Sequence, residues 1–156
     1  MSIKVGINGF GRIGRLALRE SWGCGDFDIV HINEMAGDAQ SAAHLLRFDS
    51  VHGQWDKQVS VDNGHLIIDN HKISYSQNQA ITDTDWRSAE VDLIIDCTGV
   101  FKSPEALSPY FEQGVSKVVV SAPPKSFPRD QVLTVVMGIN DHEYIEQNIV
   151  PAASCN

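Results

Sequence analysis

Short apolar runs alternate with helical patterns along most of the chain. Such runs are typical of buried parallel strands, which are covered on both faces. They predict strands at Ile3–Ile7, Ile29–Ile32, Leu93–Asp96, Val118–Ser121 and Leu133–Val136. Apolar residues at helical spacing predict crossover helices between them, and a serine-proline pair starts the last of these. The predicted helices are Arg12–Trp22, Ala39–Phe48 and Ser103 to about Gln113. This alternation predicts an α/β, doubly wound, mostly parallel sheet.

One segment breaks the alternation. Between Lys57 and Tyr75, apolar residues recur at alternate positions on both sides of an Asn63-Gly64 pair. An Asn-Gly pair in this setting is a strong signal for a tight hairpin turn. We therefore expect an antiparallel hairpin inserted into the parallel scheme, within a single domain that covers residues 1–156.

A glycine-rich turn follows the first predicted strand and opens the first predicted helix. In this context the spacing G-x-G-x-x-G indicates a dinucleotide-binding (Rossmann) fold. The first glycine allows a tight turn, the second lets a pyrophosphate approach the backbone, and the third lets helix and strand pack closely. Free N–H groups at the helix start then bind the anion. The predicted phosphate-binding residues are Gly9, Phe10, Gly11, Arg12, Ile13 and Gly14.

An acidic residue ends the second predicted strand, about twenty residues beyond the last glycine. Asn33-Glu34 stands at this point, where a dinucleotide fold holds the acid that binds the adenosine ribose hydroxyls. The carboxylate of Glu34 would repel a 2′-phosphate. We therefore predict that both residues contact the cofactor, and that the cofactor is NAD and not NADP.

Further motifs resemble those of the glyceraldehyde-3-phosphate dehydrogenase family. The run Lys4–Arg15 is similar to the opening signature of that family, and the resemblance extends over the whole chain. The other matching segments, in family order, are Phe48–Gly53, Thr98–Phe101, Ser121-Ala122-Pro123 with Lys125, Val136–Asn140 with Tyr144, and Ala153-Ser154-Cys155.

The resemblance implies an activity and roles for particular residues. Cys155 corresponds to the nucleophile that attacks an aldehyde; the adduct loses hydride to NAD and becomes a thioester, which phosphate then releases. Ser154 is expected beside the substrate. Cofactor contacts are expected from Gln79, Thr98, Gly99 and Ser121. The resemblance also implies a catalytic domain absent from this chain, a phosphorylated aldehyde substrate, a place in glycolysis and a homotetramer.

Three positions depart from the family pattern. Gln79 stands where many members carry an arginine beside the adenine, and Glu34 replaces the usual aspartate. Asn156 directly follows Cys155, whereas the family continues with two threonines. We therefore expect a truncated chain whose nucleophile loop is interrupted.

Three alternatives stay open. Asn33-Glu34 and Ala42–Phe48 also resemble the variants associated with arsenic resistance, in which arsenate would replace phosphate. An erythrose-4-phosphate dehydrogenase is a second alternative. The third is a nucleotide-binding module without turnover, because one thiol without its base and substrate site cannot complete the reaction.

Composition and charge exclude some classes of partner. The formal net charge is −8 and the twelve Lys and Arg residues are scattered, which argues against a nucleic-acid partner. Without an apolar run of signal-peptide or membrane-spanning length, we expect a cytoplasmic protein with no membrane partner. Cys24, Cys97 and Cys155 have no metal-ligand spacing, so we predict free thiols and no metal site. None of the six histidines is assigned to catalysis.

Overall fold

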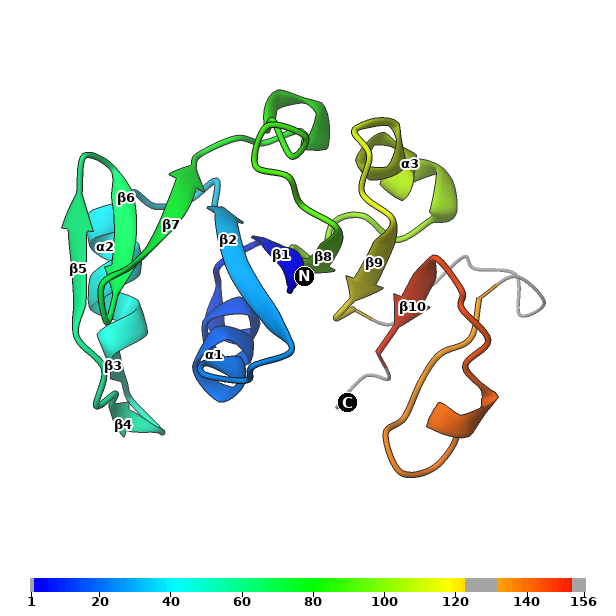
Figure 1. The fold of residues 1–156 in the computed structure, drawn as a ribbon, viewed down its shortest axis with the longest axis horizontal. Coiled ribbons are helices and arrows are strands. Elements are labelled where there is room, and N and C mark those ends of the chain that lie inside the picture. Colours follow the sequence, from blue (N-terminus) through cyan, green and yellow to red (C-terminus); the bar gives the residue numbers. More distant parts are fainter. Residues whose placement is uncertain (1, 123–131, 153–156) are drawn as a thin grey trace.

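The computed structural model describes residues 2–122 and 132–152. Within them, eight strands form one sheet in the order β10-β9-β8-β1-β2-β7-β6-β5, shown in Figure 1. Six of these strands run parallel to their neighbours in the order β10 to β7: β1 (Ile3–Asn8), β2 (Phe27–Asn33), β7 (His71–Ser76), β8 (Leu93–Asp96), β9 (Lys117–Val120) and β10 (Ile149–Pro151). The predicted α/β, mostly parallel fold is confirmed.

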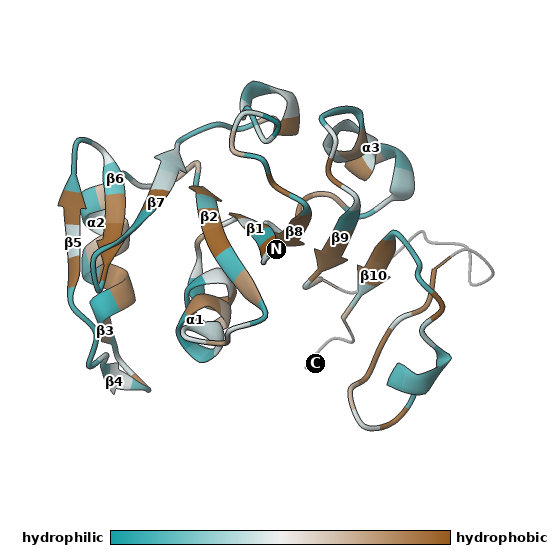
Figure 2. Cartoon of the chain, in the orientation of Figure 1, coloured by the Kyte–Doolittle hydropathy of each residue, from teal (hydrophilic) through white to brown (hydrophobic). Residues whose placement is uncertain are grey.

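The two faces of the sheet carry separate hydrophobic clusters, because successive strand residues point to opposite faces. On β8, Leu93 and Ile95 pack with the cluster that contains Leu18 of α1 (Arg12–Ser21) and Leu46 of α2 (Ala39–Arg47). Ile94, between them, belongs to the cluster that contains Leu107 and Tyr110 of α3 (Pro104–Glu112). Figure 2 shows apolar segments along β6, β8 and β10. The sheet is thus covered on both faces, as a doubly wound fold requires.

The helix starts follow from local sequence. Asp38 caps α2 by accepting a hydrogen bond from the Ser41 N–H at 2.8 Å. Ser103 caps α3 in the same way, with the Ala106 N–H at 3.3 Å and Pro104 in the first turn. The predicted crossover helices are confirmed. However, the second ends at Arg47, because Phe48 begins the short strand β3 (Phe48–Asp49), which pairs with β4 (Gly53–Gln54).

The predicted hairpin is confirmed and is larger than expected. Asn63 and Gly64 both have positive φ, 47° and 78°, as the turn between β5 (Val59–Asp62) and β6 (His65–Ile68) requires. A second turn through Asp69 and Asn70, again with positive φ, leads into β7. Strand β7 pairs antiparallel with β6 and parallel with β2, so the insertion continues the main sheet.

The predicted strand at Leu133–Val136 is wrong. Within it, Val135 forms an isolated bridge with Ala152, while the edge of β9 is occupied by β10, which the sequence did not predict. The Asn140 side chain accepts a hydrogen bond from the Val136 N–H at 2.7 Å and donates one to the Thr134 carbonyl at 3.0 Å. These bonds fold the segment into a loop that precedes η2 (Asp141–Glu143). No helix in residues 2–122 or 132–152 is long and apolar enough to cross a membrane.

Candidate dinucleotide-binding site

The three glycines of the predicted phosphate-binding turn meet three different surroundings. Gly9 has a φ of +87°, and a Cβ there would lie 2.7 Å from the backbone of Cys97 and Thr98. A Cβ at Gly14 would lie 2.2 Å from the Gly9 carbonyl oxygen. At Gly11, by contrast, a Cβ would meet nothing within 4 Å. The first and third glycines therefore allow close packing, and the second leaves the turn open on one side.

The first turn of α1 offers free hydrogen-bond donors beside this opening. Arg15 is the first residue of α1 whose N–H makes a helical bond, to the Gly11 carbonyl at 3.1 Å. The N–H groups of Arg12, Ile13 and Gly14 have no acceptor among the residues that the structure describes, and no side chain caps the helix. Unpaired N–H groups at a helix N-terminus bind anions, with the helix dipole adding to the attraction.

Hydrogen bonds fix the centre of the turn from three sides. The Phe10 N–H donates to Glu34 Oε2 at 2.6 Å, and Arg15 Nη1 donates to the Phe10 carbonyl at 2.8 Å. The Gly9 N–H donates to the Asn33 carbonyl at 2.9 Å. The Phe10 side chain is buried. The turn is therefore preorganised, and a ligand that binds it does not have to order the backbone.

A cavity of about 210 Å³ lies beside the turn, at the carboxyl ends of β1, β2 and β8. The chain leaves β1 toward β2 on one side, and β8 lies on the other, so this is the point where the strand order reverses. Ligands of open α/β sheets bind at such points. The cavity is lined by Asn8, Gly9, Gly11, Asn33, Glu34, Met35, Asn78, Gln79, Cys97, Thr98, Val100 and Phe101.

Glu34 and Asn33 differ in what they can still bind. The Glu34 carboxylate accepts from the Phe10 N–H and, through Oε1, from the Ala36 N–H at 2.8 Å. A carboxylate has about four acceptor sites, so it can also accept ribose hydroxyls. The buried Asn33 amide donates to Asn8 and Asn78 and accepts from Ser76 and Asn78, which uses its full hydrogen-bonding capacity within the protein.

A buried chain of polar side chains runs beneath the cavity, and the sequence did not reveal it. Asn33 Nδ2 donates to Asn8 Oδ1 at 2.8 Å, Asn8 Nδ2 donates to the Tyr110 hydroxyl, and that hydroxyl donates to Asp96 Oδ2 at 2.8 Å. Asp96 Oδ1 also accepts from the Thr98 N–H and hydroxyl, at 3.0 and 2.7 Å. The available signal was the polar residue that ends each of the apolar strands β1, β2 and β8.

Burial sets the ionisation of this region. It raises the pKa of Asp96, although the hydrogen bonds from Thr98 and Tyr110 oppose the shift. It also raises the pKa of Tyr110, far above its ordinary value. For Cys97, which lines the cavity, burial raises the pKa to about 11. Cys97 is therefore a neutral thiol at pH 7 and lacks the character of a nucleophile.

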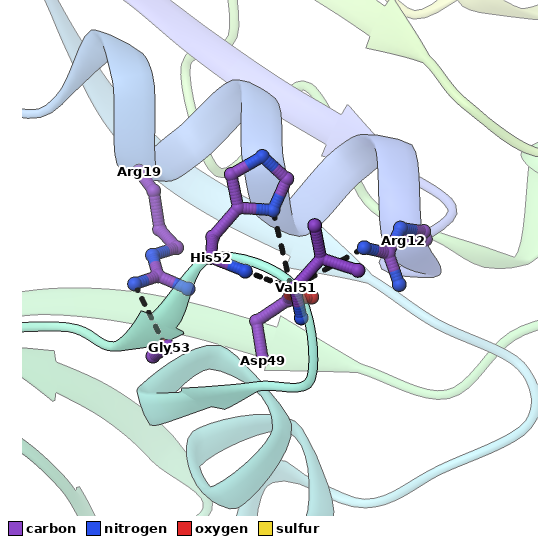
Figure 3. A network of polar contacts seen from close by, with 6 residues as sticks. All are labelled: Arg12, Arg19, Asp49, Val51, His52 and Gly53. Atoms are coloured by element: carbon purple, nitrogen blue, oxygen red, sulfur yellow. Dashed lines mark hydrogen bonds and ion pairs between the residues drawn. The ribbon is translucent and has the colours of Figure 1, made fainter.

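The Arg12 side chain points toward Asp49, as Figure 3 shows. Its Nη2 lies 3.3 Å from Asp49 Oδ1. The same oxygen accepts from the N–H groups of Val51 and His52, at 2.9 and 2.8 Å. These two backbone bonds come first among the causes that hold the pKa of Asp49 well below its usual range. Asp49 therefore closes a tight turn and, at the same time, pairs with the helix start.

The remaining predicted residues lie as follows. Gln79 and Thr98 line the cavity, and Gly99, with a φ of +68°, lies in the turn beyond Thr98. The side chain of Ile13 is 53% exposed. Ser121 follows β9 and its N–H donates to the Asp96 carbonyl at 2.9 Å, outside the cavity lining. Ser154 and Cys155 lie outside the described residues. Cys24 and Cys97 are free thiols.

These residues fit a dinucleotide. An opening at Gly11, helix-start N–H groups that no described residue binds, a fixed carboxylate and an adjoining cavity supply the groups that a pyrophosphate and a ribose need. Residues 3–104 match the family model described as glyceraldehyde 3-phosphate dehydrogenase, NAD binding domain. This chain belongs to that family. The predicted resemblance and the predicted cofactor of the domain, NAD, are confirmed.

Individual relatives agree with the family match. The chain is 46% identical to glyceraldehyde-3-phosphate dehydrogenase 3 of Nostoc sp., 37% identical to glyceraldehyde-3-phosphate dehydrogenase of Geobacillus stearothermophilus and 39% identical to that of Salmonella typhimurium. Each alignment covers 99% of this chain and 45% of the relative. The chain thus spans just under half the length of the curated relatives that it matches.

Proposed function

We propose that residues 1–156 form the NAD-binding domain of a phosphorylating glyceraldehyde-3-phosphate dehydrogenase. The observation that carries the proposal is the glycine turn, whose opening at Gly11 lies beside the N–H groups of Arg12, Ile13 and Gly14, which have no acceptor within residues 2–122 or 132–152. The match to an NAD-binding domain supports NAD as the ligand of this site.

Each part of the site has a proposed role. The N–H groups of Arg12 and Ile13 bind the pyrophosphate, as the helix N-terminus favours. Glu34 accepts the adenosine ribose hydroxyls and repels a 2′-phosphate, which gives preference for NAD over NADP. Gln79 and Thr98 both line the cavity. Gln79 is proposed to lie near the adenine, and Thr98 and the adjoining Gly99 are proposed to contact the cofactor from the turn that follows β8.

The chemistry of the whole enzyme is part of the same proposal. NAD accepts hydride when bound. Cys155 attacks the aldehyde of a phosphorylated substrate, with Ser154 beside it, to give a thiohemiacetal. Loss of hydride from this adduct, which NAD would accept, gives a thioester on Cys155, and phosphate then releases the acyl group and frees the thiol. The remaining substrate- and phosphate-binding groups are proposed to lie in the part of the relatives' length that this chain does not cover. The full-length enzyme is proposed to be a cytoplasmic homo-oligomer.

Calorimetric titration with NAD and with NADP tests the proposal. We expect NAD to bind at least about tenfold more tightly than NADP, which corresponds to about 1.4 kcal/mol. The purified chain alone should bind NAD without forming NADH when an aldehyde phosphate and inorganic phosphate are added. If titration with NAD and titration with NADP both give no binding heat, the proposal is contradicted.

A further inference from the structure

We propose that Tyr110 is a positioning residue for dinucleotide binding, because its hydroxyl group joins the two walls of the cavity. The inference rests on the proposed function, since the ligand is the same NAD. It adds a residue of α3 that does not line the cavity and that no sequence motif singled out.

The first wall is held by Asn33. Its Oδ1 accepts from the Asn78 N–H at 2.9 Å, and its Nδ2 donates to the Asn78 carbonyl at 3.0 Å. The amide of Asn33 therefore pairs with both backbone groups of Asn78, which fixes the segment that leads into Gln79. Asn78 and Gln79 both line the cavity.

The second wall is held by Asp96. Its Oδ1 accepts from the Thr98 N–H and the Thr98 hydroxyl, and the Thr98 oxygen in turn accepts from the Val100 N–H at 3.1 Å. These bonds close the turn in which Gly99 has a positive φ. Thr98 and Val100 line the cavity, and they follow β8, which lies on the other side of β1 from β2, the strand that ends at Asn33.

The Tyr110 hydroxyl connects the two walls through Asn8. The hydroxyl accepts a hydrogen bond from Asn8 Nδ2 and donates one to Asp96 Oδ2 at 2.8 Å. The other end of the Asn8 amide, Oδ1, accepts a hydrogen bond from Asn33. All four side chains are buried, with exposed fractions between 0 and 3%. A hydroxyl group has one proton and can accept a second bond, so both functions of this group are used.

Two features make Tyr110 a positioning residue instead of a ligand contact. Its side chain is fully buried, and its ring packs on Trp86 with the ring centroids 5.7 Å apart. Its effect on a ligand therefore has to pass through Asn8 and Asp96. Buried polar networks in which every group is paired specify one arrangement, because an unpaired group is costly.

The test compares Tyr110→Phe with Trp86→Phe. The first variant removes the hydroxyl and divides the polar chain. The second loses a buried hydrogen bond from Trp86 Nε1 to the Ile81 carbonyl, in the same hydrophobic cluster, but removes no group of the polar chain. We expect Tyr110→Phe to weaken NAD binding by about tenfold, as loss of a buried hydrogen bond predicts. Trp86→Phe should lower the melting temperature at least as much and change the NAD affinity less than about twofold.

A spectroscopic readout separates positioning from general destabilisation. In NMR spectra, Tyr110→Phe should shift the backbone amide signals of Thr98 and Asn78, on the two walls, whereas Trp86→Phe should leave them near their original positions. Asp96→Asn removes the acceptor of the hydrogen bond from the Tyr110 hydroxyl. It is the second variant if Tyr110→Phe does not fold. It should also weaken NAD binding.

The outcomes distinguish this inference from the proposed function. If the unmodified chain binds NAD and Tyr110→Phe binds it equally well, the positioning role is overturned while the proposed function stands. Equal loss of affinity in Tyr110→Phe and Trp86→Phe also overturns it, because the effect is then one of stability. If the unmodified chain binds no NAD, the proposed function fails and this inference fails with it.

Discussion

The Glu34 carboxylate accepts a hydrogen bond from the backbone N–H of Phe10 at 2.6 Å, so the acid directly after β2 holds the centre of the glycine turn that follows β1. One side chain therefore serves two purposes, the order of the phosphate-binding turn and the proposed recognition of the ribose. A substitution at this position should reveal both.

Glu34→Gln should weaken NAD binding and reduce the preference over NADP. The amide has one acceptor oxygen for the two N–H groups of Phe10 and Ala36, and its NH₂ group faces the other donor. Without the negative charge, a 2′-phosphate is no longer repelled. We expect the dissociation constant for NADP, divided by that for NAD, to fall by about tenfold in calorimetric titrations. An unchanged ratio would show that another group sets the preference.

Alanine substitutions at two glycines should separate folding from binding. Gly14→Ala places a Cβ 2.2 Å from the Gly9 carbonyl oxygen, so it should destabilise the fold by several kcal/mol, roughly as overpacking does. Gly11→Ala meets no atom within 4 Å and has a φ of −67°, so the melting temperature should change little.

The same Gly11→Ala variant should nevertheless bind NAD at least about tenfold more weakly, because the methyl group occupies the space through which the pyrophosphate reaches the backbone. Thermal unfolding and NAD titration of both variants check this pair. A Gly11→Ala protein with full affinity would contradict the proposed position of the pyrophosphate.

Acid should destabilise the fold through His31. Burial lowers the pKa of this side chain from 6.5 to about 4, between the hydroxyl groups of Ser74 and Ser76. Because the native pKa lies below the unfolded value, the unfolded state binds more protons between these values. The contribution of neutral His31 is complete above pH 6.5 and is lost as the pH falls to about 4; it amounts to about 3 kcal/mol.

Urea unfolding at pH 7 and at pH 4.5 measures this loss. The His31→Gln variant is the control, since it keeps a polar side chain that does not titrate. Its unfolding free energy should depend less on pH than that of the unmodified chain. Equal dependence in the two proteins would assign the acid sensitivity to other groups.

Asp49→Ala should affect stability more than Arg12→Met. Asp49 accepts two backbone N–H groups that close the turn before Gly53, whereas the ion pair with Arg12 is partly exposed to solvent and contributes little. We expect the melting temperature to fall at least twice as far in Asp49→Ala. If Arg12→Met has the larger effect, the ion pair and not the turn holds this loop.

Most of the fold followed from periodicity, and the failures lie where the pattern is short or ambiguous. Ile149–Pro151 has three residues and ends in proline, so its sequence does not resemble a strand. Leu133–Val136 has the composition of a strand, but β10 already occupies the edge of β9, and Asn140 binds its backbone instead. Two segments of the chain can compete for the same sheet edge, and the outcome depends on their tertiary contacts. The spacing of apolar residues within each segment carries no information about those contacts.

The sequence predicted the part of the site that is local in the chain and missed the part that depends on distant contacts. The glycine turn and Glu34 are marked by spacing along the chain, because their geometry is local to one strand, turn and helix. The polar chain through Asn8, Tyr110 and Asp96 joins residues up to 102 positions apart. No rule of sequence spacing links these three residues. Taken one at a time, each is an ordinary polar residue at a strand end or in a helix.

The outer strand β10 forms one edge of the sheet, and its last residue limits what that edge can pair with. An exposed strand edge offers unpaired N–H and carbonyl groups to a neighbouring molecule, and short edges with proline reduce this risk. Pro151 has no N–H group, and its carbonyl already accepts a hydrogen bond from Val135 at 3.0 Å. At Pro151 this edge is therefore a poor template for β-pairing with another molecule.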